Sequence, residues 1–186
     1  PAVIVAELMR GLDKTAFEQI LVTGFCDENE ADYLDTVAKD IVATRIAGLG
    51  RSISLIADLK AFFGLISLIR KYKPDVIHTH TAKAGVLGRM ASILAGRGAV
   101  RIHTFHGHLL HGYFGKGKTR VVVVIEKTLG WISHGLISIG TNVMNDLLKV
   151  GIGSESKFHV IFPGLQNLDL LPKAQAQKEL GLDPEK

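Results

Sequence analysis

The chain has 186 residues, one cysteine and a net charge of +4, with 47% hydrophobic and 22% charged residues. This composition is typical of a protein with one soluble core, and it excludes a disulfide framework and a low-complexity chain. The longest uncharged stretch of the second half, residues 128–145, is too polar to cross a bilayer, and the first residues do not form a secretory signal, so we expect a cytoplasmic protein.

The first predicted elements are a helix over residues 2–12 and two strands, residues 19–23 and 41–47, with an acidic loop between them. Apolar residues at helical spacing predict a long helix over residues 54–71, which ends before Pro74. We expect its apolar face to comprise Leu55, Leu59, Phe62, Phe63, Ile66 and Ile69.

The rest of the chain alternates strands with helices. The predicted strands are residues 75–79, 100–105, 136–139 and 158–162, and the predicted helices are residues 82–94, 118–131, 141–149 and 173–180. In residues 118–131 a valine run favours a strand, but Val121, Ile125 and Leu129 share one helical face opposite the charged residues, so we predict a helix with Trp131 in the core. The alternation predicts an α/β fold: a Rossmann-like parallel sheet with helices on both faces, and a ligand at the carboxyl ends of its strands.

Two of these strand ends carry histidines. We expect His80 and His106 to be neighbours at the rim of the sheet if their strands pair, and we assign them a functional role as hydrogen-bond donors, general bases or metal ligands. For His78 and His103 we predict a structural role, half-buried and bonded to backbone. The helix that begins near Ala82 directs its N-terminus at the same rim, where a phosphate or carboxylate can bind.

The paired histidines also resemble the start of a zinc site. Such a site needs further ligands after later strands, and Gly140-Thr141-Asn142 and Pro163-Gly164 do not supply them. We therefore predict that the protein holds no metal.

Basic residues are concentrated between residues 97 and 127, where Glu126 is the single acid. They are Arg97, Arg101, Lys116, Lys118, Arg120 and Lys127. Two interpretations remain open: a surface for phosphates, anionic lipid headgroups or nucleic acid, and a solvated face without a partner.

Four segments resemble, in the same order, motifs of the family 4 (group 1) glycosyltransferases. They are DVIHTHTAKAGVLGR (residues 75–89), HTFHGH (residues 103–108), the segment of residues 135–148, and KFHVIFPG (residues 157–164). The resemblance implies the N-terminal half of a GT-B fold. Residues 1–164 would form the acceptor-side domain without its first strand, and residues 165–186 a linker to an absent C-terminal domain that binds the donor.

The implied activity is transfer of a sugar from a nucleotide-sugar donor to a sugar or lipid-linked acceptor, with retention of configuration and with no metal or other cofactor. The resemblance implies that His106 is the catalytic residue that contacts the transferred sugar. The substrate-binding residues that we predict are His80, Thr81, Lys83, Gly85, Phe105, Gly107, His108, Lys118 and Arg120.

We further expect peripheral contact with the inner face of the membrane, no nucleic-acid partner, and no activity from these residues without the C-terminal domain. Two alternatives stay open. A sugar-nucleotide epimerase shares the GT-B architecture and would form product without an acceptor. A non-catalytic module that binds anions or membranes would account for the basic stretch alone.

Overall fold

The computed structural model describes residues 1–27, 29–96, 98–107, 116–164 and 171–182, with side chains of the helix at residue 116 described from Arg120 onward. The helices are α1 (Ala2–Gly11), α2 (Tyr33–Thr36), α3 (Leu55–Tyr72), α4 (Ala82–Leu94), α5 (Lys116–Ile132), α6 (Thr141–Lys149), the short 3₁₀ helix η1 (Glu155–Lys157) and α7 (Lys173–Glu179). The strands are β1 (Leu21–Thr23), β2 (Ala43–Arg45), β3 (Val76–His80), β4 (Val100–Phe105), β5 (Gly135–Ser138) and β6 (Phe158–Val160).

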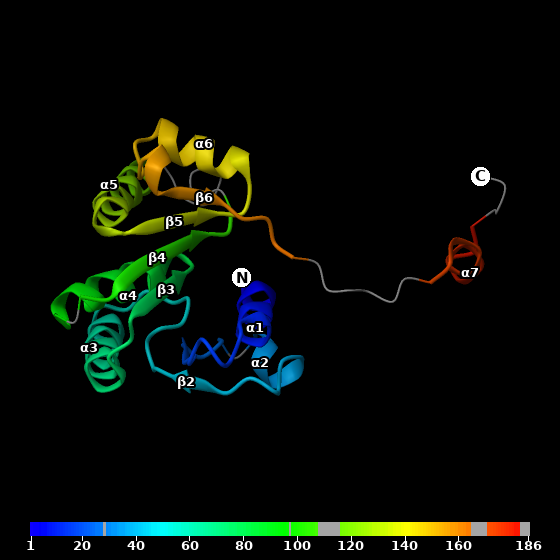
Figure 1. Cartoon of the computed structure of the whole chain (residues 1–186), viewed down its shortest axis with the longest axis horizontal. Helices are drawn as coiled ribbons and strands as arrows, with labels where there is room; N and C mark the ends of the chain where they lie inside the picture. The colour runs from blue at the N-terminus through cyan, green and yellow to red at the C-terminus, as the bar shows by residue number, and fades with distance from the viewer. Residues whose placement is uncertain (28, 97, 108–115, 165–170, 183–186) are drawn as a thin grey trace.

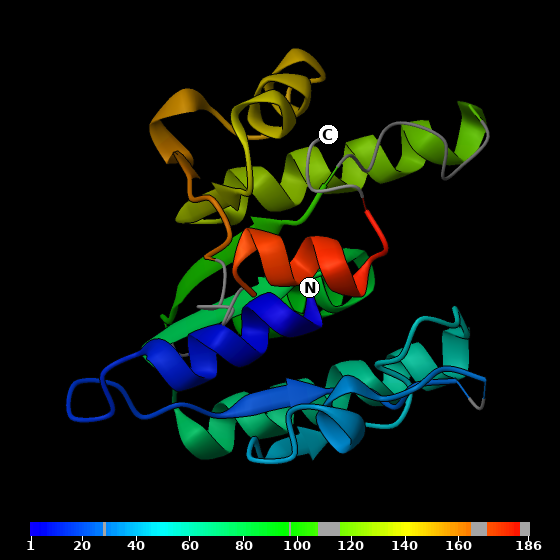
Figure 2. The same ribbon diagram turned by 90° about the vertical axis from the view of Figure 1, so that its right-hand side faces the viewer.

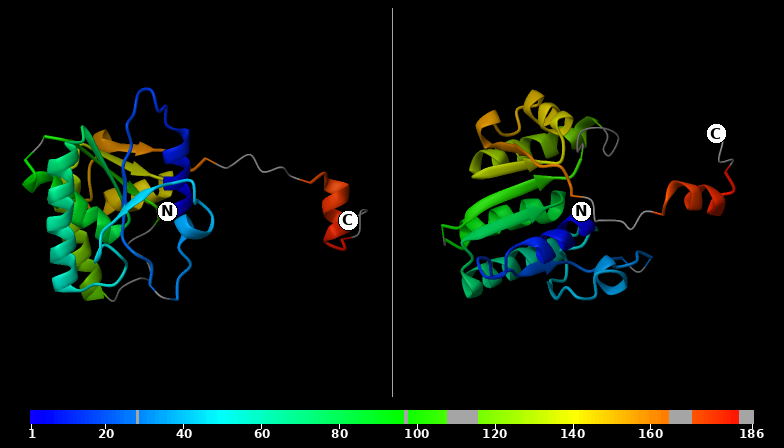
Figure 3. Two further views of the ribbon diagram at one scale, coloured as in Figure 1. Left: turned by 90° about the horizontal axis from the view of Figure 1, so that it is seen from below. Right: turned by 45° about the vertical axis from the view of Figure 1, so that its right-hand side comes forward.

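The strands form two parallel sheets, one of four strands in the order β3-β4-β5-β6 and one of two strands, β1 and β2. The two-stranded sheet lies at one end of the molecule and β6 at the other (Figures 1 and 2). Helices α3, α4 and α5 lie together on one side of the strands, and α1 lies on the opposite side (Figures 1 and 3). This arrangement confirms the predicted α/β fold with a parallel sheet and helices on both faces.

The core consists of two apolar clusters. One lies between α3 and α4 and includes Ala61, Leu65, Ile69, Ala91 and Ala95. The other packs α6 on the later strands and comprises Phe105, Leu136, Val143, Leu147, Ile152 and Phe158. Ile77 of β3 packs against the first cluster, and Phe105 of β4 belongs to the second.

The predicted apolar face of α3 is partly wrong. Leu55, Leu59 and Phe63 are 84%, 52% and 60% exposed. The helix instead packs through Ala61 and Leu65 against small residues of α4, because small side chains allow two helices to approach closely. The apolar stripe of α3 is wider than the surface that α4 covers.

Helix α5 is present as predicted, but its orientation differs from the expected one. Glu126 is buried, whereas Val121, Val124 and Trp131 are 61%, 63% and 79% exposed, so Trp131 is not a core residue. The carboxylate of Glu126 pairs with Arg89 of α4 inside the molecule. With this side of α5 turned inward, Val121 is exposed, whereas Leu129 of the predicted face is 3% exposed and belongs to the core. Among the described residues no helix is both long enough and apolar enough to cross a membrane.

Candidate functional site at the ends of β3 and β4

The predicted neighbours His80 and His106 lie together at the carboxyl ends of β3 and β4. These strands pair in parallel, with His80 opposite Thr104. Nδ1 of His80 is 2.9 Å from Nε2 of His106, which is hydrogen-bond distance. The structure therefore confirms their predicted proximity.

A third histidine, His78, contacts this pair from within β3. The ring of His78 lies against that of His80 in a tilted arrangement, with 4.2 Å between centroids and 38° between the ring planes. Nε2 of His78 is 2.7 Å from Oγ1 of Thr104, which connects this ring pair to β4. The three imidazoles thus form one layer across the two strand ends.

Burial keeps the rim histidines neutral near pH 7. Burial, with a smaller contribution from the neighbouring His78 and His106, lowers the pKa of His80 to about 3. It also lowers the pKa of His106 to about 4. Both values follow from the cost of placing a charged imidazole in a partly dry environment. Nδ1 of His106 is itself buried and has no hydrogen-bond partner in the described part of the chain.

Behind the rim lies His103, which is 1% exposed. Its Nδ1 is 2.9 Å from Oγ1 of Thr79, and its ring meets the edge of Phe105. The structure agrees with a structural role for His103, although the residue is fully buried rather than half-buried and its partner is a side chain rather than the predicted backbone. Phe105 is 2% exposed, so its side chain belongs to the core and only its backbone lies at the rim.

Gly85 allows α4 to lie close to His103. A Cβ atom at Gly85 would lie 2.5 Å from Cε1 and 3.0 Å from Nδ1 of His103, which is too close for either group. Gly85 itself is buried. The structure thus gives this glycine a packing role, and its predicted substrate contact stays a prediction.

The start of α4 carries two further predicted residues. Thr81 has φ 62° and ψ 163°, a conformation nearly restricted to glycine that is found mainly at functional sites. Nζ of Lys83 lies 2.5 Å from Oδ1 of Asp58 and also donates to the carbonyl of Ser52. Lys83 therefore holds α4 to α3 and its preceding loop, and it has a partner within the chain.

The other predicted contacts lie where β4 leads toward α5. Gly107 follows His106 directly, and a Cβ there would meet no atom within 4 Å, so the backbone is open at this point. Arg120 is exposed on α5. His108 and the side chain of Lys118 lie outside the described residues.

Sequence reasoning missed a buried ion pair next to the rim. Nη2 of Arg89 lies 2.9 Å and 2.8 Å from the two carboxylate oxygens of Glu126, and the two side chains are 0% and 1% exposed. Nε of Arg89 donates to the carbonyl of Gly85 at 2.9 Å. The sequence signal for this pair was that Glu126 is the single acidic residue of the basic stretch. Its partner Arg89 lies 37 residues away in the sequence, so the pairing itself could not be read from the local pattern.

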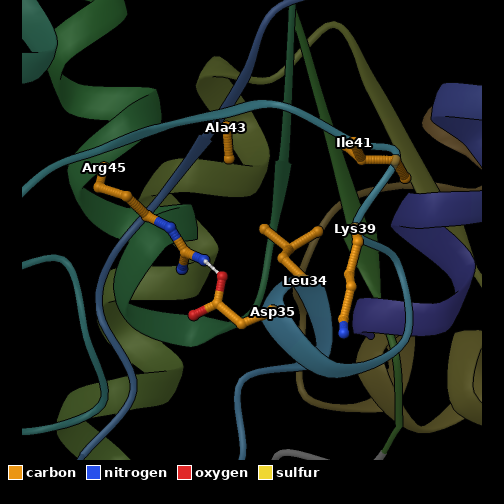
Figure 4. Close-up of a pocket in the computed structure, with 6 residues that line it drawn as sticks. All are labelled: Leu34, Asp35, Lys39, Ile41, Ala43 and Arg45. Atoms are coloured by element: carbon orange, nitrogen blue, oxygen red, sulfur yellow. Dashed lines mark ion pairs between the residues drawn. The ribbon is translucent and has the colours of Figure 1, made fainter.

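A separate pocket lies beside α2 and β2 and contains none of the predicted site residues (Figure 4). Its lining comprises Leu34, Asp35, Lys39, Ile41, Ala43 and Arg45. Arg45 pairs there with Asp35 at 3.5 Å and with Asp32 at 2.6 Å, so its charge is already compensated. In the part of the chain that the structure describes, no three His, Cys, Asp or Glu side chains are arranged to hold a metal ion, and the absence of a metal stays a prediction.

The sequence profile of Glycosyltransferase Family 4 matches residues 2–166, nearly the whole chain. The chain belongs to Glycosyltransferase Family 4. The family 4 chain is 42% identical to the UDP-Gal:alpha-D-GlcNAc-diphosphoundecaprenol alpha-1,3-galactosyltransferase of Escherichia coli over 92 residues. This aligned region covers 48% of this chain and 23% of that protein. It is 30% identical to the capsular polysaccharide biosynthesis glycosyltransferase CapM of Staphylococcus aureus over 117 residues, and this aligned region covers 63% of this chain and 30% of that protein.

The family 4 chain thus spans less than a third of either relative. Its fold resembles a crystal structure from Listeria monocytogenes of a protein named as a UDP-N-acetylglucosamine 2-epimerase, with a TM-score of 0.60 over 86% of this chain and 40% of that one. The sequence identity to that structure is 17%, so the likeness concerns the fold alone.

Proposed function

We propose that the protein is part of a glycosyltransferase that transfers a sugar from a nucleotide-sugar donor to a lipid-linked acceptor. The observation that carries this proposal is the pair of neutral histidines, His80 and His106, at the strand ends of a family 4 chain. The Escherichia coli relative, whose name specifies a diphosphoundecaprenol-linked acceptor, supports the lipid-linked substrate. The donor would bind between this domain and a C-terminal domain that follows residues 165–186.

In this proposal His106 contacts the transferred sugar near its anomeric carbon. Glycosyl transfer passes through an oxocarbenium-like state in which positive charge develops on the sugar. A neutral imidazole does not repel that charge, and a hydrogen bond that strengthens as the charge develops lowers the barrier. Nδ1 of His106 is shielded here, so the atoms that cover it have to move before a sugar hydroxyl reaches it. Transfer with retention and without a metal is part of the proposal.

The test is turnover of the full-length enzyme with a nucleotide sugar and a diphosphate-linked lipid acceptor. We expect His106→Ala to lower kcat by about 100-fold to 1,000-fold, which is the usual cost of losing one group that stabilises the transition state. His159→Ala serves as the matched control, since His159 is exposed on β6. Normal turnover by His106→Ala would refute this role. Conversion of the nucleotide sugar without an acceptor would indicate an epimerase.

We also propose that the outward face of α5 contacts a membrane with anionic headgroups. Val121, Val124 and Trp131 lie on this face, and the exposed basic residues Arg120 and Lys127 lie beside them. Apolar residues with a tryptophan and flanking cations suit the boundary between acyl chains and negative headgroups. Such contact would bring the strand ends to a lipid-linked acceptor at the inner face of the membrane.

Sedimentation of the full-length protein with vesicles tests this contact. We expect binding to vesicles of phosphatidylglycerol and phosphatidylcholine, weaker binding to phosphatidylcholine alone, and loss of binding in Val124→Asp. Val42→Asp is the control, because Val42 is 88% exposed on the loop before β2. Equal binding by Val124→Asp and wild type would refute membrane contact through this face of α5.

A further inference from the structure

The hydrogen bond between His80 and His106 links the proton positions of the two rings. A neutral imidazole carries one N–H and one bare nitrogen, so one ring donates and the other accepts. Nδ1 of His80 faces Nε2 of His106 at 2.9 Å. If His106 donates, its own Nδ1 is a bare acceptor; if His80 donates, Nδ1 of His106 carries the hydrogen.

The chain holds His80 from two sides. Its ring contacts the ring of His78, and His78 in turn hydrogen-bonds to Thr104. Its strand, β3, pairs in parallel with β4 in a fixed register. His106 lies one residue beyond the end of β4, before Gly107, and in the described part of the chain its ring contacts and hydrogen-bonds that of His80. The better-held histidine therefore orients the less constrained one.

We propose that His80 is a positioning residue that orients the His106 ring and fixes its tautomer. Nε2–H of His106 donates to Nδ1 of His80, and Nδ1 of His106 remains an acceptor for a hydroxyl of the bound sugar. In this arrangement both rings carry the hydrogen on Nε2, which is the form that neutral imidazole prefers in water. The inference rests on the proposed function, and it gives His80 a role other than the direct substrate contact that we predicted.

An acceptor nitrogen suits the proposed chemistry. A sugar hydroxyl that donates to Nδ1 gains electron density on its oxygen, and this density stabilises the positive charge of the transition state. The titratable side chains that face the pair are His78 on β3 and His103 on β4. Both have lowered pKa values through burial, so the imidazoles of this cluster stay neutral near pH 7.

The first experiment reads the tautomer without any substrate, by ¹⁵N NMR of histidine-labelled full-length protein. We expect a protonated Nε2 and a bare Nδ1 for His106 in wild type, and a mixture of both forms in His80→Ala. His80→Asn keeps an amide oxygen near the position of Nδ1, so it should restore the wild-type tautomer. A protonated Nδ1 of His106 in wild type, or the same tautomer in His80→Ala, would overturn the proposal.

The second experiment measures turnover of the same variants. We expect His80→Ala to lower kcat by about 10-fold to 100-fold with little change in KM for the donor, because a misplaced catalytic group costs mainly the chemical step. His80→Asn should recover most of the loss, and His159→Ala should match wild type. Normal kcat in His80→Ala together with an inactive His106→Ala would refute positioning while leaving the proposed function intact. An active His106→Ala would refute the proposed function, and the NMR result would still decide the tautomer.

Discussion

Replacing Glu126 with glutamine is expected to destabilise the fold strongly, because it leaves the guanidinium of Arg89 as an unpaired cation in the interior. Both side chains are almost completely buried, and Nη2 of Arg89 contacts both carboxylate oxygens. The remaining partner of Arg89 is the carbonyl of Gly85, which carries no charge that could compensate. Removing one partner of such a buried pair costs about 3–5 kcal/mol. We expect a loss of that size in the free energy of unfolding of Glu126→Gln.

Urea denaturation with linear extrapolation measures the loss. Glu155→Gln is the matched control, since Glu155 is exposed in η1 and should change stability little. The double variant Arg89→Met/Glu126→Leu removes both charges and should recover most of the stability, since apolar residues often replace a buried pair without loss. A cost below about 1 kcal/mol for Glu126→Gln, the size expected of a surface pair, would refute the reasoning. So would a double variant as unstable as the two single variants combined.

Three further variants test other parts of the structure. Gly85→Ala should cost about 1–3 kcal/mol of unfolding free energy, because its Cβ would clash with the ring of His103; a wild-type thermal midpoint would contradict this. Lys157→Met should cost about 1–2 kcal/mol in the same measurement, because Nζ caps the C-terminal carbonyls of α5 at 2.5–3.3 Å; an unchanged midpoint would show that the cap is dispensable. Stability should fall as the pH drops below about 6.5, since the unfolded chain protonates His80 and His106 before the folded chain does, until their folded pKa values of about 3 and 4 are reached. Urea midpoints at pH 7 and pH 5 should therefore differ less in His80→Asn/His106→Asn than in wild type, and an identical difference would argue against this pair as the source.

The sequence was sufficient for the fold and for the contact between His80 and His106. Both follow from local signals: a short apolar strand, the glycine or proline that ends it, and the rule that parallel strands end at the same edge. Because each histidine lies at a strand exit, adjacency of the strands was enough to bring them together. The domain boundary at residue 164 and the substrate contacts stay predictions.

The orientation of the helices could not be predicted in the same way. The outward face of α5 depends on the distant partner of Glu126, and the exposed end of α3 depends on how much of it the small residues of α4 cover. A helical pattern identifies an apolar face but does not say which neighbour covers it. A buried arginine that pairs with the single acid of a basic stretch is a tertiary feature, and with it Val121 of the expected face is exposed while Leu129 remains buried.

The ion pair of Arg89 and Glu126 also connects α4 directly to α5 inside the molecule. The guanidinium of Arg89 donates both to the carboxylate of Glu126 in α5 and to the carbonyl of Gly85 one turn earlier in α4. Gly85 in turn lies against His103 behind the histidine rim. In the proposed function, a displacement of the start of α4 on sugar binding would therefore act on α5 through this pair. The buried ion pair therefore connects the histidine rim to α5, whose outward face lies on the other side of that helix.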